Sequence, residues 1–172
     1  MLDPILRRHT ARLTAPLAQR VAAFHPLALT LSAFVIAVVA MIDIGHRNYL
    51  WGLGLLIVAR AFDALDGPAA RRRAPTPFGA YLDRVLSLIV GAGLAFAFAL
   101  AEPDRALAAM FLMLGLVVRT AAGADAAKTE LTLAFALACA FPDWFSLAAY
   151  SLGIMSFLEA GGLVAAAAVR AP

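Results

Sequence analysis

Six apolar stretches follow one another along this chain, and only short polar or proline-containing segments separate them. They run from Pro26 to Ile42, Tyr49 to Phe62, Ala80 to Ala101, Arg105 to Ala122, Thr129 to Phe141 and Trp144 to Val169. A helix needs roughly 20 apolar residues to cross the hydrocarbon core of a bilayer. We therefore expect an all-α, polytopic membrane protein with six transmembrane helices and no sizeable water-soluble domain.

Composition agrees with a membrane protein. The chain is 63% hydrophobic, whereas soluble domains are nearer ~45–50%. Its net charge of +3 is carried almost wholly by arginine, which in membrane proteins reflects topology, so we expect no nucleic-acid partner. The single Cys139 supports neither an internal disulfide nor a zinc site.

The N-terminal segment has a different pattern from the apolar stretches. In residues 1–24, arginines alternate with leucine, isoleucine, valine and phenylalanine, which is typical of an amphipathic helix lying on a membrane surface. A solvated charged arm is the alternative. We expect one domain over residues 1–172, with a juxtamembrane amphipathic helix at 1–24 and a six-helix bundle at about 26–170.

The arginines also predict the orientation of the bundle. If the N-terminus is inside, the cytoplasmic side holds the four N-terminal arginines, Arg71 to Arg73, Lys128 and Arg170, while the opposite side holds only Arg47 and Arg105. This bias is the positive-inside pattern. We therefore expect a multi-pass protein of the cytoplasmic (inner) membrane with both termini in the cytoplasm.

Three aspartates stand inside or at the ends of the second and third apolar stretches. Asp63 and Asp66 are three residues apart, so they share one face of a helix. Antiparallel packing of the next helix would bring Asp83 opposite them. Converging carboxylates in a region of low dielectric are tolerated when a hard divalent cation neutralises them. The pattern therefore predicts a site for Mg²⁺ or Mn²⁺.

Two glycines flank this predicted site. Gly67, followed by Pro68, is expected to end the second helix, and Gly79 to open the third. Glycine has no Cβ, so a ligand can approach its backbone closely. The alternative for Gly67-Pro68 is a plain helix stop.

These residues form a spaced motif that resembles the signature of the CDP-alcohol phosphatidyltransferase family, integral membrane enzymes of phospholipid synthesis. The motif here is Asp63-x2-Asp66-Gly67-x2-Ala70-Arg71-x7-Gly79-x3-Asp83. The family's six-helix fold with an N-terminal amphipathic helix would cover essentially the whole chain.

The resemblance implies a two-metal transfer of a substituted phosphate group. The acids matching Asp63, Asp66 and Asp83 would hold two Mg²⁺ or Mn²⁺ ions against the pyrophosphate of a CDP-linked lipid such as CDP-diacylglycerol. Residues matching Gly67, Ala70, Arg71 and Gly79 would shape the cytidine and phosphate pocket. An alcohol acceptor would attack the phosphorus that bears the lipid, and CMP would leave. Family members are also dimers, so a homodimer is expected.

Two positions depart from the family pattern. Ser87 stands where the family has a fourth aspartate, which binds metal and is proposed to take the acceptor's proton. A neutral hydroxyl performs neither role well. Leu27 follows Pro26 where many relatives carry asparagine. Two outcomes stay open: a transferase with altered chemistry, and a degenerate member that binds nucleotide, lipid or a partner without turnover.

Other charged residues offer weaker hypotheses. Glu130 or Asp125 could replace the missing base. Arg119 and Lys128 could bind an anionic acceptor, although Arg119 could instead snorkel or pair with Glu130. A transporter that uses intramembrane acids for ion coupling is a third reading of the chain, but such a protein has no need of the glycine, alanine and arginine of the motif.

Overall fold

The computed structural model describes residues 26–72, 77–124 and 128–170, and every regular element within them is helical. The predicted amphipathic helix at residues 1–24 lies outside the described residues and stays a prediction. The helices are α2 (Pro26–Gly45), α3 (Tyr49–Arg72), α4 (Pro77–Ala101), α5 (Ala106–Ala121), α6 (Lys128–Ala140) and α7 (Phe145–Arg170). Short 3₁₀ turns, η1 (Pro103–Arg105) and η2 (Pro142–Trp144), precede α5 and α7.

Prolines mark several of these helix starts. Pro26 and Pro77 are the first residues of α2 and α4, and Pro103 and Pro142 open the two 3₁₀ turns. Proline suits a first helical turn because its φ angle is already helical and the missing N–H has no partner there. The six predicted stretches therefore correspond to the six described α-helices, and four of these begin with a proline or directly after a 3₁₀ turn that a proline opens.

One predicted helix end is wrong. Gly67-Pro68 was expected to stop the second helix, but α3 continues to Arg72. A proline inside a helix removes one backbone hydrogen bond. The helix can continue past the proline where neighbouring groups form hydrogen bonds with the freed backbone groups. Gly79 likewise does not open the next helix, because α4 begins two residues earlier, at Pro77.

Three of the helices are long and apolar enough to cross a membrane by themselves. These segments are Ala28–Gly45, Phe78–Ala101 and Pro142–Val169. Helices α5 and α6 are shorter, at 16 and 13 residues, and the second half of α3 is rich in charged residues. Six membrane crossings therefore stay a prediction.

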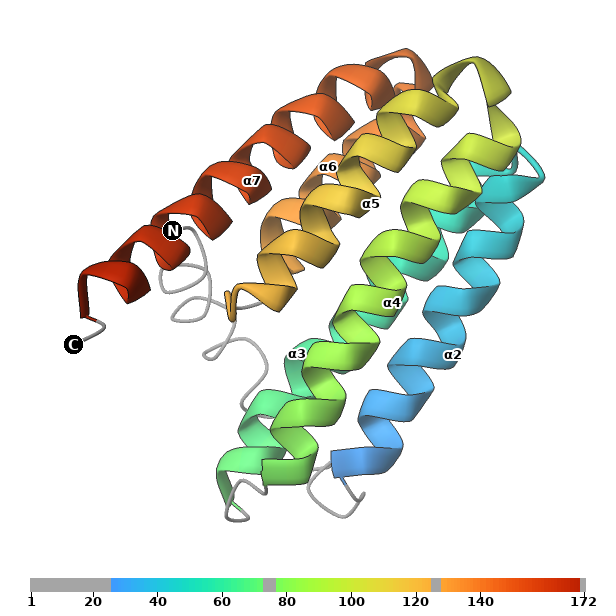
Figure 1. The fold of residues 1–172 in the computed structure, drawn as a ribbon. Helices are drawn as coiled ribbons and strands as arrows, with labels where there is room; N and C mark the ends of the chain where they lie inside the picture. The colour runs from blue at the N-terminus through green and yellow to red at the C-terminus, as the bar shows by residue number, and fades with distance from the viewer. Residues whose placement is uncertain (1–25, 73–76, 125–127, 171–172) are drawn as a thin grey trace.

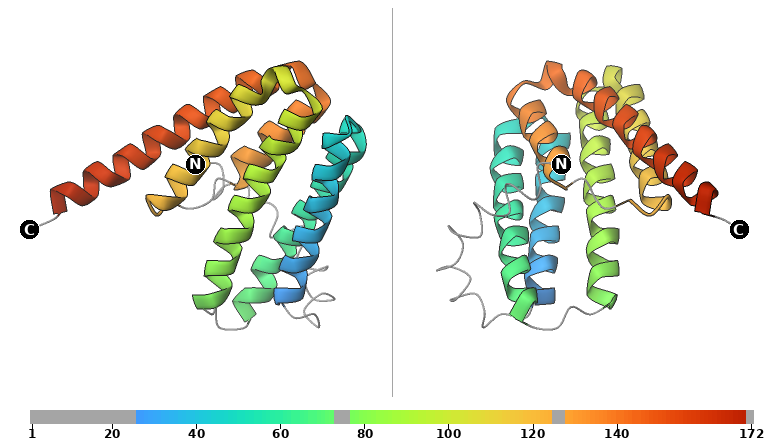
Figure 2. Two further views of the ribbon diagram at one scale, coloured as in Figure 1. Left: turned by 45° about the vertical axis from the view of Figure 1, so that its right-hand side comes forward. Right: turned by 90° about the vertical axis from the view of Figure 1, so that its left-hand side faces the viewer.

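The helices pack in two groups. Helix α2 packs against α3 and α4, while α5 packs between α4 and α7 (Figure 1). Helix α6 contacts α3 and α7 and so joins the groups. In Figure 2, the C-terminal part of α7 extends beyond the other helices, and residues 161–169 are all exposed.

The core of the bundle is centred on Phe98 of α4, which is fully buried. Its ring stacks on Tyr49, Phe135 and Phe145, with centroid distances of 5.7, 6.0 and 4.4 Å. These partners come from α3, α6 and α7. Offset aromatic stacking of this kind holds the two helix groups together.

Polar contacts join the helix connections at one end of the bundle. Arg47 Nε donates to the carbonyl oxygen of Ala101 (2.8 Å), and the hydroxyl of Tyr49 donates to Glu102 Oε1 (3.0 Å). Arg105 forms an ion pair with Asp143 (2.6 Å). The turn between α2 and α3 is thereby tied to the α4–α5 connection, and that connection to the one before α7.

The outer surface of the bundle is strongly apolar. Large hydrophobic side chains are exposed on every helix, including Leu50 (78%), Trp51 (75%), Leu107 (71%) and Leu158 (71%). Exposed apolar surface on this scale is unfavourable in water but suits contact with lipid. Together with the three long apolar helices, it identifies a membrane protein.

Candidate active site

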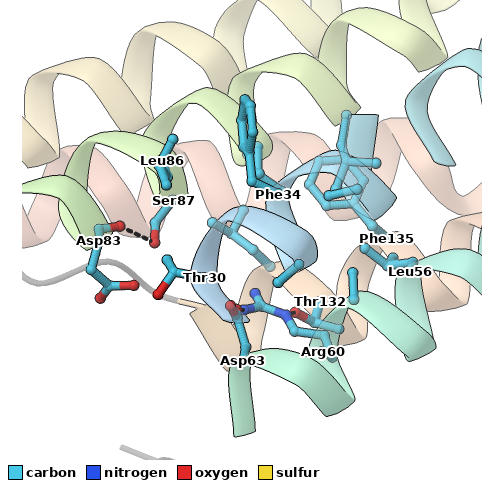
Figure 3. Close-up of a pocket in the computed structure, with 17 residues that line it drawn as sticks. Thr30, Phe34, Leu56, Arg60, Asp63, Asp83, Leu86, Ser87, Thr132 and Phe135 are labelled. Carbon is cyan, nitrogen blue, oxygen red and sulfur yellow. Dashed lines mark hydrogen bonds and ion pairs between the residues drawn. The ribbon is translucent and has the colours of Figure 1, made fainter. Parts of the chain in front are cut away.

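A pocket lies between α2, α3, α4 and α6, at the end of the bundle opposite the polar connections. Its volume is about 50 Å³, enough for a few water molecules or ions. Apolar side chains such as Phe34, Leu56 and Phe135 form its inner part (Figure 3). Its polar lining residues are Thr30, Arg60, Asp63, Asp83, Ser87 and Thr132.

Asp63 is held by an arginine on its own helix. Arg60 Nη1 donates to Asp63 Oδ2 at 2.7 Å, and the two side chains are 26% and 27% exposed. Arg60 Nε also donates to the hydroxyl of Thr132 on α6. The guanidinium therefore lies in the pocket wall, and it links α3 to α6 as well as neutralising part of the charge on Asp63.

Asp83 and Ser87 share one turn of α4. The hydroxyl of Ser87 donates to the backbone carbonyl of Asp83 at 2.6 Å, which is a common arrangement for serine inside a helix. In Figure 3, Asp63 and Asp83 lie at the same end of the pocket, away from Phe135 and Leu56, with Thr30 of α2 between them. Carboxylates from α3 and α4, the two helices that flank α2, thus line a single pocket.

Several predicted site residues fall where side chains are not described. The backbone of Asp66, Gly67, Ala70 and Arg71 belongs to α3, but their side chains lie outside the described part of the structure. Gly79 lies in the first turn of α4. Among the described side chains, no group of three or more His, Cys, Asp or Glu that could hold a metal ion is found.

The chemistry of the lining residues fits a hard divalent cation. Asp63 and Asp83 supply carboxylate oxygens, and the remaining polar groups beside them are hydroxyls and a guanidinium. Mg²⁺ and Mn²⁺ prefer oxygen ligands of this kind. Among the lining residues that the structure describes, Arg60 is the one of opposite charge, so it competes with a metal ion for Asp63.

The weaker sequence candidates lie elsewhere. Glu130 is in the first turn of α6 and is half-buried, but it is absent from the residues that line the pocket. Asp125 and the side chain of Lys128 are outside the described residues. Arg119 of α5 pairs with Glu159 of α7 at 2.9 Å. Its partner is therefore Glu159 and not Glu130, the acid considered from the sequence.

Sequence reasoning missed Arg60, Thr132 and Glu159. Arg60 precedes Asp63 by three residues, and this spacing alone favours an ion pair on a helix. Glu159 is an acid within a long apolar helix, where a charged group needs a partner. Thr132 gave no signal, because its contact with Arg60 joins residues 72 positions apart.

Comparison with known proteins identifies the class to which this architecture belongs. Inner membrane protein YnjF of Escherichia coli is 32% identical, with 77% of this chain and 78% of the relative covered. Archaetidylinositol phosphate synthase of Methanothermobacter thermautotrophicus is 36% identical over 84 residues, which are 48% of this chain and 40% of that relative.

The family assignment rests on a longer match. Residues 23–169 match the CDP-alcohol phosphatidyltransferase family. This range includes both pocket aspartates and all the described helices except the last residue of α7. The chain therefore belongs to the CDP-alcohol phosphatidyltransferase family.

Proposed function

We propose that this chain transfers a phosphatidyl group from a CDP-linked lipid, such as CDP-diacylglycerol, to the hydroxyl group of an alcohol, with release of CMP. The observation that supports this most is the pocket itself. It joins Asp63 of α3 to Asp83 of α4, and these are two of the acids that the family motif places at this spacing. The apolar surface around it would keep the lipid substrate in the membrane.

We propose that Asp63, Asp66 and Asp83 bind Mg²⁺ or Mn²⁺. The carboxylates on the pocket wall support this, and Asp66 follows Asp63 by three residues on the same helix. When bound, such an ion neutralises phosphate oxygens and stabilises the charge that develops during transfer. The pocket residues would then orient the phosphates, which accounts for much of the catalysis in phosphoryl transfer.

The C-terminal part of α3 and the first turn of α4 would bind the nucleotide. Arg71 is next to the last residue of α3, and Gly79 is in the first turn of α4. We assign Gly67, Ala70 and Gly79 to close approach of the cytidine and phosphates, and Arg71 to their negative charge. Small residues permit such an approach, and a guanidinium suits phosphate oxygens.

In the proposed reaction, the acceptor oxygen forms a bond to the phosphorus that bears the lipid. The bond from that phosphorus to the CMP oxygen breaks, and CMP leaves with the electron pair. The acceptor proton needs a base, and the hydroxyl of Ser87, which donates to the Asp83 carbonyl, is not one. A pocket carboxylate, Asp83 foremost, would have to receive the proton instead.

Ser87 also supports a second candidate function. A member without the fourth acid could bind CDP-lipid, nucleotide or a partner without turnover. The hydrogen bond from Ser87 to the Asp83 backbone favours this alternative, because it leaves the serine in a structural role. The two candidates differ in one measurable property, the release of CMP.

The test is a CMP-release assay on purified protein in mixed micelles with Mn²⁺ and CDP-diacylglycerol. The acceptor panel would contain uncharged polyols, phosphorylated polyols and amino alcohols. Release that depends on both Mn²⁺ and one acceptor class supports the transferase. Absence of release across the panel contradicts it.

Ser87→Asp separates the two candidates further. If only this variant releases CMP, the natural chain is a degenerate binder. If the natural chain is active and Ser87→Asp leaves its rate unchanged, the base lies elsewhere. Arg47→Gln, at the far end of the bundle, is a matched control that changes one charge without touching the pocket.

We further infer that the pocket faces the cytoplasm, that both termini lie on that side, and that the protein works as a homodimer. The orientation is supported by the arginines of the sequence and by the placement of Arg47 and Arg105 together at the opposite end. Labelling of single cysteines introduced near Arg47 and near the C-terminus, from each side of the membrane, tests the orientation. Chemical cross-linking in membranes tests the dimer.

A further inference from the structure

Arg60 is a fixed positive charge inside the pocket. Its guanidinium is held by Asp63 on α3 and by Thr132 on α6, and only 26% of its side chain is exposed. Two anchors on different helices restrict the movement of a long side chain. Arginine also stays protonated in proteins at any ordinary pH.

The charges of the pocket lining are therefore uneven. Among the described side chains, two carboxylates and one guanidinium line it, and the other polar lining residues are the hydroxyls of Thr30, Ser87 and Thr132. Ser87 stands where the family motif has a fourth acid. Within this described lining, a hydroxyl thus replaces one expected negative charge, and a positive charge is added by Arg60.

We propose that Arg60 takes the place of the second metal ion, so that each chain binds one Mg²⁺ or Mn²⁺ and the guanidinium supplies the other positive charge. This rests on the proposed metal site. Three carboxylates from Asp63, Asp66 and Asp83, one guanidinium and one divalent cation leave no net charge. Four acids and two divalent cations, the arrangement implied by the family motif, are balanced in the same way.

The substitution at Ser87 and the position of Arg60 then have one explanation. A second divalent cation beside a fixed guanidinium would be repelled, and no fourth carboxylate would offset that repulsion. A guanidinium can perform part of a metal ion's work, because it neutralises carboxylates and binds phosphate oxygens. Arg60 is accordingly a positioning residue for the acids and a permanent cation of the site.

The experiment counts bound Mn²⁺ per chain by electron paramagnetic resonance, with purified protein in an uncharged detergent. Nonspecific binding is subtracted with a variant that lacks both pocket acids, Asp63→Asn with Asp83→Asn. The natural chain should bind one Mn²⁺ and show no signal from a spin-coupled pair. Arg60→Gln combined with Ser87→Asp should bind two Mn²⁺ and show the coupled signal.

Three matched variants separate charge from packing. Arg60→Lys and Thr132→Val both keep the positive charge, so each should still bind one Mn²⁺ even if the bundle is less stable. Arg84→Gln removes a neighbouring arginine that is exposed and absent from the pocket lining, and it should also leave the count at one. A fourth variant, Ser87→Asp alone, restores the acid and keeps Arg60, so it should also bind one Mn²⁺. Two Mn²⁺ bound to it would show that the missing acid, and not Arg60, sets the count.

The outcomes are distinct. Two Mn²⁺ bound to the natural chain would overturn the role of Arg60 while leaving the proposed transferase intact. A count of one in a folded double variant would overturn it as well. No Mn²⁺ on the natural chain would refute the metal site itself, and the inference with it. If the double variant does not fold, the counts on the natural chain and on Ser87→Asp decide, and two Mn²⁺ on either would overturn the role of Arg60.

Discussion

Two of the places where the described helices carry charged side chains are built differently. Between α5 and α7, one base meets one acid: Arg119 pairs with Glu159 at 2.9 Å. In the pocket between α2, α3, α4 and α6, the described lining residues include two carboxylates and a single guanidinium. The first place is balanced by its own side chains, and the second has acids in excess.

The packing around the two places also differs, because the ion pair lies where helices pack tightly and the pocket lies beside a cavity. Four residues before Arg119 and six before Glu159, α5 and α7 approach so closely that a Cβ on Gly115 would lie 3.1 Å from the carbonyl oxygen of Gly153. Small residues permit such close contact of membrane helices. The pocket instead encloses a cavity. A charge in a membrane helix is unfavourable without a partner, so the balanced pair serves packing, while the acid-rich cavity suits a cation and a phosphate.

The largest expected effect distinguishes the acids of the two places. Asp83→Asn should lower the rate of CMP release by about 100-fold or more, because it removes a charge that acts on the reacting phosphate. Glu159→Gln, the same change in the α5–α7 pair, should leave the rate of folded protein essentially unchanged. Initial rates of CMP release at saturating Mn²⁺ measure both effects. Equal losses of rate in the two variants would contradict the distinction between the pocket acid and the paired acid.

The next effect concerns stability. Arg119→Leu leaves Glu159 without its partner and should lower the free energy of unfolding by about 1–3 kcal/mol. Unfolding in mixed micelles with increasing denaturing detergent measures this. The reversed pair, Arg119→Glu with Glu159→Arg, should recover much of the loss. If it recovers nothing, the pair does not contribute through its charge.

A smaller effect is expected at the glycine contact. Gly115→Ala places a methyl group against the backbone of Gly153 and should destabilise the bundle by about 1 kcal/mol. Gly54→Ala is the matched control, since a Cβ there meets nothing within 4 Å. That variant should be neutral or stabilising because alanine favours helix. Similar unfolding curves for both would mean that α5 and α7 do not need their close approach.

The smallest effect lies at the end of the bundle with the polar connections. Arg47 is 3.8 Å from Glu102, and its side chain is 63% exposed. Arg47→Gln should therefore change the free energy of unfolding by less than about 1 kcal/mol, with CMP release unaffected. A large loss of activity would show that this end communicates with the pocket.

Local sequence patterns predict most of the helix boundaries. Apolar length, starting prolines and short polar connections predict the starts of the six described helices and five of their six C-terminal ends to within three residues, because these signals act within one segment. The end of α3 at Arg72 could not be read from Gly67-Pro68, because whether a proline stops a helix depends on what surrounds it. The partner of Arg119 was also beyond the sequence, since it depends on which face of α7 meets α5.

In the candidate site too, local features could be predicted from the sequence and tertiary contacts could not. The spacing of Asp63, Asp66 and Asp83 is local and visible in the sequence, as is the serine at position 87. The contact of Arg60 with Thr132 of α6 is tertiary and could not be predicted from the sequence. It holds in the pocket wall a positive charge that the motif does not include.

The most direct test of the pocket as a metal and nucleotide site is equilibrium binding of CDP in the presence of Mn²⁺, measured for the natural chain and for Asp63→Ala. The natural chain should bind CDP only when Mn²⁺ is present, and Asp63→Ala should lose binding of both. If Asp63→Ala binds Mn²⁺ and CDP as well as the natural chain does, the assignment of this pocket is wrong.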